Sequence, residues 1–317
     1  MKIGRRSLLI SLAALFLLGA CSDRSSDLAR QSNQPTPAAP CRTVEHGMGK
    51  SCVPLQPQRI VVVGELDNVI ALGVKPVGAI TFDTGEFPKY LGDKTQGIQK
   101  VGTYSQPSLE KILLLKPDLI IGSTWNDAGL YNQLSRIAPT VFVETNDNLR
   151  WKDWFRKEAE TLGKTQETEQ LIQQYEQRVQ RFRQAMGDRL PTTKISVVNF
   201  WQDNVRIYMK RSFSGQILQE VGLPRPAAQD KDKIWERISL ELIPSMDGDA
   251  IFLLLGDHNV SKLKQFQQHP LWSKLQPVKA QKVYEVDGYL WIAGWSITSA
   301  NLILDDLFQH LVEQQPS

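Results

Sequence analysis

Short runs of Val, Ile and Leu that alternate with helical segments restrict most strongly how this chain can fold. In the first half of the sequence, such runs occur at 59–64, 76–81, 118–123 and 140–144, with helical patterns between them. Strands that are buried on both faces are continuously apolar, and strands joined by helices form parallel sheets with helices on both sides. The first half therefore predicts an α/β lobe.

The second half repeats this organisation after a long helical stretch. Apolar runs recur from residue 195 onward, and residues 151–187 carry apolar side chains at helical spacing, interrupted at Gly163. We expect an N-terminal lobe at 41–147, a connecting helix at 148–188 and a C-terminal lobe at 189–317. The predicted fold is α/β, with two Rossmann-like lobes whose sheets are mainly parallel, a long helix that joins them and a ligand cleft between them.

The first twenty residues have the pattern of an export signal. Basic residues precede an apolar run at 8–18, which is shorter than a membrane-spanning helix requires. The run ends in Leu-Gly-Ala-Cys, which resembles a bacterial lipobox and implies that Cys21 carries a lipid; a plain secretory peptide is the alternative. Because 5–9 also resembles a twin-arginine signal, the sequence leaves the export route open.

Residues 21–40 are predicted to be the lipid anchor and a disordered linker. They are rich in Ser, Gln, Pro and Asp and hold almost nothing to bury. Loss of residues 1–20 would reduce the 37 Lys and Arg to 34, which equals the 34 Asp and Glu. A neutral mature chain with mixed charges gives no basic surface for nucleic acid, so we exclude nucleic-acid binding.

Three cysteines are compatible with an exported protein. If Cys21 carries a lipid, Cys41 and Cys52 remain as one pair in a compartment where disulfides persist. Two free thiols are the alternative. We expect a disulfide between Cys41 and Cys52.

Common enzyme motifs are missing from the sequence. It contains neither dinucleotide-binding nor phosphate-binding glycine patterns, and neither H-E-x-x-H nor G-x-S-x-G. The four histidines are far apart in the sequence, which disfavours a dedicated metal site. We therefore expect a binding protein without catalytic residues, cofactor or metal ligands.

One short pattern occurs once in each predicted lobe. Ser-Leu-Glu at 108–110 lies ten residues before the start of an apolar run at 118, and Ser-Leu-Glu at 239–241 lies ten residues before the run that begins at 249. An acidic residue in a first helical turn is favoured by the helix dipole whatever its function. Its recurrence at one register in both lobes favours a shared role.

Several blocks in a fixed order resemble the iron-siderophore (class III) periplasmic binding proteins. The resemblance runs from about Cys41 to the end, and its blocks include VEHGMGKSCVPLQPQRIVVV, VGTYSQPSLEKILLLKPDLIIG, SFSGQILQEVGLPRPAAQ and VDGYLWIAGWSITSANLILDDLF. This resemblance implies capture of a ferric chelate for an ABC importer. It also implies that Glu110 and Glu241 contact arginines of the membrane permease, although the residues after Glu241 depart from the family pattern.

A ferric siderophore brings iron that already has its ligands, so its carrier needs aromatic walls and charged hydrogen-bond donors. Ligands of open α/β sheets lie where loops follow strands. Tyr104 stands where relatives often carry Arg, Trp125 and Trp201 follow strands, and Arg206 and Tyr208 share one face of a predicted hairpin. The expected ligand contacts are Tyr104, Trp125, Trp201, Arg206, Tyr208, Trp235, Arg237 and Trp291.

The sequence thus predicts a monomeric lipoprotein in the periplasm or at the outer face of the cytoplasmic membrane, in contact with the membrane only through its lipid. A cobalamin or haem carrier of the same class is the alternative binding protein, and a cell-envelope hydrolase is the alternative enzyme. Core packing is the alternative role of Trp125 and Trp201. Hydroxamate, citrate-hydroxamate and catecholate ligands all suit these residues. A stiff connection predicts only a small closure when ligand binds.

Overall fold

The computed structural model describes residues 40–125, 128–145, 150–201, 204–255 and 260–313. The predicted signal peptide, Cys21 and nearly all of the linker lie outside these residues and stay predictions. Within the described ranges, no helix is both long enough and apolar enough to cross a bilayer.

A two-stranded antiparallel hairpin precedes the first lobe and had no counterpart in the sequence prediction. It consists of β1 (Cys41–His46) and β2 (Gly49–Pro54), and both strands contact β7. A disulfide joins Cys41 to Cys52, whose Cα atoms are 5.5 Å apart, which confirms the predicted pairing. The hairpin buries Val44 and Val53 in the core.

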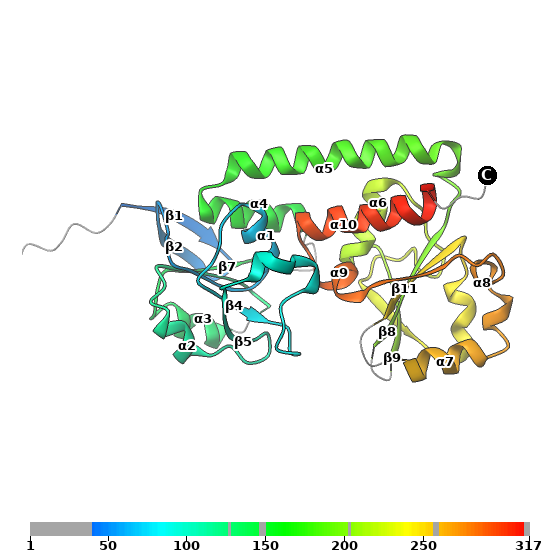
Figure 1. Cartoon of the computed structure of the whole chain (residues 1–317), viewed down its shortest axis with the longest axis horizontal. Helices are drawn as coiled ribbons and strands as arrows, with labels where there is room; N and C mark the ends of the chain where they lie inside the picture. The colour runs from blue at the N-terminus through cyan, green and yellow to red at the C-terminus, as the bar shows by residue number, and fades with distance from the viewer. Residues whose placement is uncertain (1–39, 126–127, 146–149, 202–203, 256–259, 314–317) are drawn as a thin grey trace, which may run out of the picture. The chain divides into compact units, whose positions relative to one another are not determined.

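The first lobe contains a five-stranded parallel sheet with the strand order β5-β4-β3-β6-β7 (Figure 1). Its strands are β3 (Ile60–Val63), β4 (Gly78–Thr81), β5 (Gln99–Thr103), β6 (Leu119–Ser123) and β7 (Thr140–Val143). Its helices are α1 (Leu66–Ala71), η1 (Lys89–Thr95), α2 (Leu109–Leu114) and α3 (Ala128–Leu134). All residues of β3, β4, β6 and β7 are buried, as the continuous apolar runs predicted.

The second lobe contains a mixed sheet with the strand order β10-β9-β8-β11-β12. Three strands are parallel, whereas β9 pairs antiparallel with both β8 and β10. The strands are β8 (Ile195–Trp201), β9 (Asn204–Tyr208), β10 (Trp235–Ile238), β11 (Ala250–Leu255) and β12 (Val283–Asp287). The helices are η2 (Gly187–Arg189), α6 (Phe213–Val221), η3 (Leu240–Met246), α7 (Val260–Gln268), η4 (Trp272–Lys274), α8 (Gln276–Lys279), α9 (Gly288–Ala293), α10 (Ile297–Phe308) and η5 (Gln309–Glu313).

Two helices occupy the predicted connection between the lobes. These are α4 (Trp151–Leu162) and α5 (Thr165–Met186), and the chain turns between them at Gly163, whose φ is 70°. Such a left-handed residue favours glycine and commonly ends a helix. Helix α5 buries one stripe of side chains at alternating spacings of four and three residues, namely Thr168, Ile172, Tyr175, Val179, Phe182 and Met186.

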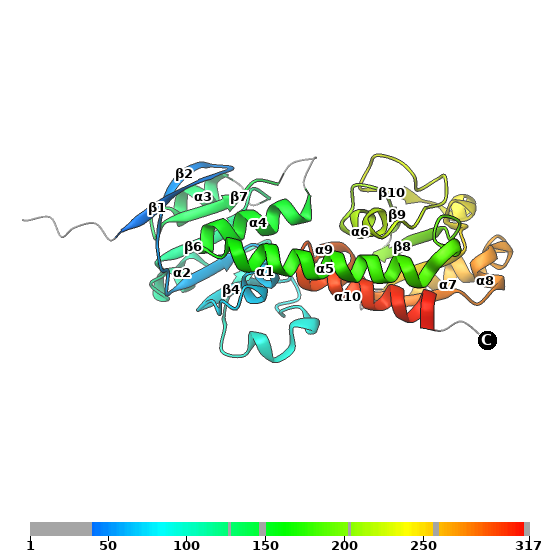
Figure 2. The same cartoon turned by 90° about the horizontal axis from the view of Figure 1, so that it is seen from above.

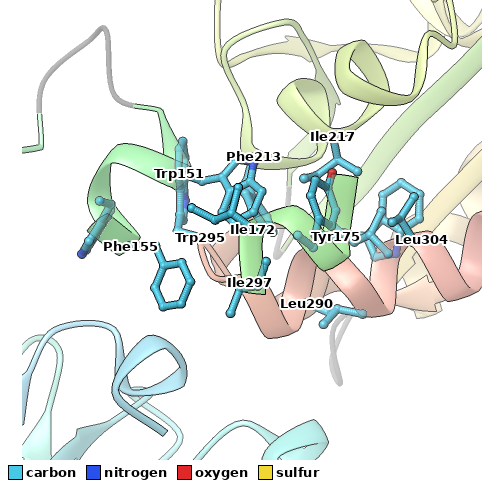
Figure 3. Close-up of a cluster of buried hydrophobic side chains, with 14 of the residues drawn as sticks. Trp151, Phe155, Ile172, Tyr175, Phe213, Ile217, Leu290, Trp295, Ile297 and Leu304 are labelled. Atoms are coloured by element: carbon cyan, nitrogen blue, oxygen red, sulfur yellow. The ribbon is translucent and has the colours of Figure 1, made fainter. Parts of the chain in front are cut away.

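The hydrophobic core continues from one lobe into the other through this helical layer. Helix α10 runs beside α5, and the two are in contact (Figures 1 and 2). Side chains of α4, α5, α6, α9 and α10 gather in one apolar cluster that includes Trp151, Tyr175 and Phe213 (Figure 3). The connection is therefore broader than the single long helix that the sequence suggested.

Candidate functional site

Two arginines face each other at the edge of the second sheet. Arg206 on β9 lies opposite Arg237 on β10, and Asn199 on β8 lies on the other side of Arg206. Residues directly opposite in an antiparallel pair project from the same face. The strand pairing thus brings Asn199, Arg206 and Arg237 together in one polar row. The sequence nominated both arginines but did not predict that they lie opposite each other.

The two guanidinium groups have no carboxylate partner among the described residues. Like charges directly opposite in a sheet are destabilising. The guanidinium carbon of Arg206 lies 4.3 Å from the ring centroid of Trp235, while its buried Nε atom has no hydrogen-bond acceptor within the described ranges. An anionic guest would offset both costs.

A pocket of about 520 Å³ lies beside this polar row, between the sheet and α9. Its walls are Asn199, Arg206, Tyr208, Gly288, Tyr289, Ile292 and Ala293. The pocket therefore contains Arg206 and Tyr208, both of which the sequence nominated. The sequence did not nominate Asn199 and Tyr289, although each lies near the carboxyl end of a strand, where ligands of open α/β sheets are expected.

An aromatic row links this pocket to the first lobe. The ring of Tyr289 stacks on that of Phe82 at 4.5 Å between centroids, and Phe82 stacks on Tyr104 at 6.1 Å. Phe82 directly follows β4, so the strand-end rule would also have found it. The two lobes are in contact at this point, and the pocket lies on the second-lobe side of the contact.

The hydroxyl of Tyr104 is already engaged inside the first lobe. It lies 2.9 Å from Glu65 Oε1 and 3.2 Å from the backbone carbonyl of Gly64. Burial, together with the nearby Asp67, raises the pKa of Glu65 well above its ordinary value. Burial also raises the pKa of Tyr104 well above its ordinary value, an effect that the Glu65 carboxyl reinforces. Tyr104 therefore offers the face of its ring rather than a free hydroxyl.

The predicted tryptophans have different surroundings. Trp125 is 53% exposed, and its ring packs edge-on against Trp154 and Trp295. Trp235 is 38% exposed beside Arg206. The backbone of Trp201 ends β8 and pairs with Asn204, but its side chain lies outside the described part of the chain.

Trp291 does not lie at a ligand-accessible surface, contrary to the sequence prediction. Its side chain is fully buried, stacks on Phe252 and donates a hydrogen bond from Nε1 to Asp306 Oδ2 at 2.7 Å. Trp295, which lies between α9 and α10, is also buried. We therefore omit Trp291 from the proposed ligand contacts.

Glu110 and Glu241 occupy equivalent exposed positions in the first turns of α2 and η3. Two residues after each glutamate, Ile112 and Ile243 are fully buried, so the same register anchors both segments to their lobes. The Glu241 carboxylate accepts a hydrogen bond from Ser239, which lowers the pKa of Glu241.

Comparison with known proteins identifies the family of this chain. The model of a family described as periplasmic binding protein matches residues 64–290, which is more than half of the chain. The chain belongs to the periplasmic binding protein family. It is 35% identical over 316 residues to the probable siderophore-binding lipoprotein YfiY of Bacillus subtilis (strain 168), and the match covers 95% of each chain.

Two further members of the periplasmic binding protein family are also similar. The achromobactin-binding periplasmic protein of Dickeya dadantii (strain 3937) is 31% identical, over 79% of this chain and 85% of its own. The crystal structure of Staphylococcus aureus SirA complexed with staphyloferrin B superposes with a TM-score of 0.75 at 32% identity, over 85% of this chain and 98% of that chain. These matches span both lobes and confirm the predicted family and fold.

Proposed function

We propose that this periplasmic binding protein captures a ferric siderophore and delivers it to the permease of an ABC importer. The observation that carries the proposal is the row of Arg206 and Arg237, which have no acidic partner in the described part of the chain and lie next to Trp235. A bulky anionic chelate satisfies this arrangement because it supplies oxygen acceptors to the guanidinium groups and flat surface to the rings. The relatives named above support the same ligand class: one is siderophore-binding by name, one is achromobactin-binding by name, and one was solved with staphyloferrin B.

The proposed ligand contacts are Tyr104, Trp125, Trp201, Arg206, Tyr208, Trp235 and Arg237, to which the pocket adds Asn199 and Tyr289. Arg206 and Arg237 would hold the negative edge of the chelate. Trp235 and Tyr289 would pack against its apolar parts, and Asn199 would donate a hydrogen bond. Tyr104 would act through its ring, because its hydroxyl is paired with Glu65.

The lipid at Cys21 and the docking of Glu110 and Glu241 on the permease belong to the same proposal. Exposure of both glutamates at one register supports docking, and relatives that are lipoproteins by name support the anchor. The proposed location is the outer face of the cytoplasmic membrane or the periplasm, and the protein would work as a monomer.

Intrinsic tryptophan fluorescence tests the ligand class. Titration with ferric citrate and with a ferric trihydroxamate should quench emission, because a ferric chelate beside Trp235 accepts its excitation energy. Arg206→Ala should weaken binding by about 10- to 100-fold, the range for loss of charge-assisted hydrogen bonds.

Arg181→Ala is the matched control, since Arg181 is an exposed arginine on α5, a helix outside the sheet that carries Arg206 and Arg237. It should bind with unchanged affinity. Flat emission with every anionic ferric chelate, including a catecholate, would remove the proposed function. Equal affinity of Arg206→Ala and the unsubstituted protein would remove the proposed site.

A further inference from the structure

Exposed leucines lie beside both proposed docking glutamates. Among the described residues, seven large apolar side chains are exposed, and three of them lie within four residues of Glu110 or Glu241. These are Leu113 at 58%, Leu114 at 71% and Leu242 at 51% exposure. Single exposed apolar residues are common, but their concentration at two equivalent positions indicates a surface that becomes covered.

Helix α2 shows why these leucines are outside. The helix has six residues and buries only Ile112 fully; Leu109 packs partly against the core, and Leu113 and Leu114 remain exposed. Leu113 and Leu114 follow Glu110 by three and four residues, which places a carboxylate and two isobutyl groups on one side of the helix. Glu110 has no cationic partner within the described part of the chain.

The corresponding segment of the second lobe combines the same chemistry. Leu242 directly follows Glu241, and both residues line a groove whose other walls include Arg237, Ile238, Lys262 and Phe266. Ile243 anchors this segment as Ile112 anchors α2. A carboxylate next to exposed leucine therefore occurs once in each lobe.

We propose that each docking contact has two parts, in which the glutamate pairs with a cation of the permease and the neighbouring leucine enters an apolar pocket beside that cation. This inference rests on the proposed function. An isolated exposed ion pair contributes little, whereas an apolar side chain that is desolvated in the contact and surrounds the pair contributes much more. The leucines thus supply the adhesion, and the glutamates supply orientation.

The permease is the occupant that fits best. Carboxylates that form no salt bridge among the described residues favour a partner with basic groups, and they oppose contact with an anionic lipid surface. A second copy of this chain would place carboxylate against carboxylate.

Uptake of iron-55 as its ferric chelate tests the proposal with the full-length protein, in cells that lack the chromosomal copy. Leu113→Ala with Leu114→Ala, and separately Leu242→Ala, should lower uptake at limiting protein by about tenfold. Fluorescence titration should show unchanged ligand affinity. Leu55→Ala is the matched control, because Leu55 is 48% exposed and lies outside both segments; its uptake should be normal.

A crosslinking experiment identifies the molecule that covers the exposed leucines. With Cys21 lipidated and Cys41 paired with Cys52, Leu114→Cys provides a single free thiol for a photoreactive maleimide in intact cells. The expected product is an adduct with a multi-spanning membrane protein, which Leu55→Cys should not give. Adducts only with lipid or with a second copy of this chain would overturn the proposal.

The outcomes separate this inference from the function on which it rests. Normal uptake by the leucine variants, with loss of uptake in Glu110→Ala and Glu241→Ala, would overturn the two-part contact and leave the importer function intact. Failure of the unsubstituted protein to bind any anionic ferric chelate would instead contradict the proposed function itself.

Discussion

At the scale of single residues, buried carboxyls gather where α1 meets α10. Asp67 Oδ2 accepts hydrogen bonds from Tyr90 at 2.6 Å, Ser296 at 3.1 Å and Ser299 at 3.2 Å. Burial raises the pKa of Asp67 to about 6 despite these three donors. Glu158 on α4 is also fully buried, which raises its pKa to about 8, and its Oε2 has no partner within the described ranges.

Glu158 predicts a stability that falls as pH rises. Its folded pKa of about 8 exceeds the ordinary 4.5, so between these values the folded protein binds more protons than the unfolded chain and loses stability with increasing pH. Glu158→Gln should therefore raise the free energy of unfolding by roughly 3 kcal/mol at pH 9 and change it much less at pH 5. Urea unfolding at several pH values measures this.

The control for Glu158→Gln is Glu160→Gln, an exposed glutamate of the same helix. Its unfolding free energy should follow that of the unsubstituted protein at each pH. A pH profile for Glu158→Gln parallel to that of the unsubstituted protein would show that Glu158 is ionised in the folded state without penalty.

Trp291 and Trp235 should respond oppositely to substitution. Trp291→Phe removes the hydrogen bond to Asp306 from a fully buried site and should cost about 1–3 kcal/mol of stability, with ligand affinity unchanged. Trp235→Ala should leave stability within about 0.5 kcal/mol and weaken ligand binding. Denaturant unfolding and fluorescence titration of both variants check this, and weakened ligand binding by folded Trp291→Phe would restore its predicted ligand role.

At the scale of elements, a side chain of β1 forms hydrogen bonds with the last turn of α4. Arg42 donates a hydrogen bond from Nε to the carbonyl of Glu160 at 3.2 Å. Its Nη2 atom donates a second hydrogen bond to the carbonyl of Thr161. These carbonyls belong to the last turn of α4, whose final groups lack partners within the helix. The hairpin absent from the sequence prediction therefore helps to end the first connecting helix at Gly163.

Gly163→Ala should destabilise the protein by about 1–2 kcal/mol, because the position has a φ of 70° and a Cβ there would lie 3.3 Å from the Arg42 guanidinium. Gly73→Ala is the control. Gly73 also follows a helix with a positive φ, of 74°, but a Cβ there would meet no atom within 4 Å. Thermal unfolding should show a larger loss for Gly163→Ala, and equal losses would mean that the Arg42 contact adds nothing.

At the scale of the whole molecule, the lobes share one core. The apolar cluster extends from Val62 in the first sheet through Tyr175 to Phe252 in the second sheet. Asn68 donates a hydrogen bond to the carbonyl of Trp295, and Asp67 accepts one from Ser296, which adds a polar connection just before α10. Relative movement of the lobes would have to disrupt close-packed side chains, which is costly.

Small-angle scattering with and without a ferric chelate should therefore give nearly the same radius of gyration. The physical reason is that several packed helices, rather than a pair of flexible strands, connect the lobes. The scattering profiles with and without the chelate should overlap at the low angles that depend on the arrangement of the two lobes. A decrease of several ångströms on loading would contradict the shared-core argument.

Local patterns determined much of this protein. Continuous Val and Ile runs specify buried parallel strands, apolar spacing specifies the connecting helices, and the number of cysteines favoured the Cys41–Cys52 pair, all because these signals act over neighbouring residues. The repeated Ser-Leu-Glu pattern likewise predicted equivalent positions for Glu110 and Glu241 at the start of two helical segments.

Only the tertiary structure decided which side chains meet. The register between β9 and β10 sets Arg206 opposite Arg237, and a shift of one residue would have turned the two arginines to opposite faces. Packing against Phe252 buries Trp291, whereas the position of β10 at the sheet edge leaves Trp235 exposed. Burial and strand pairing depend on residues far apart in the chain, so no local pattern contains them.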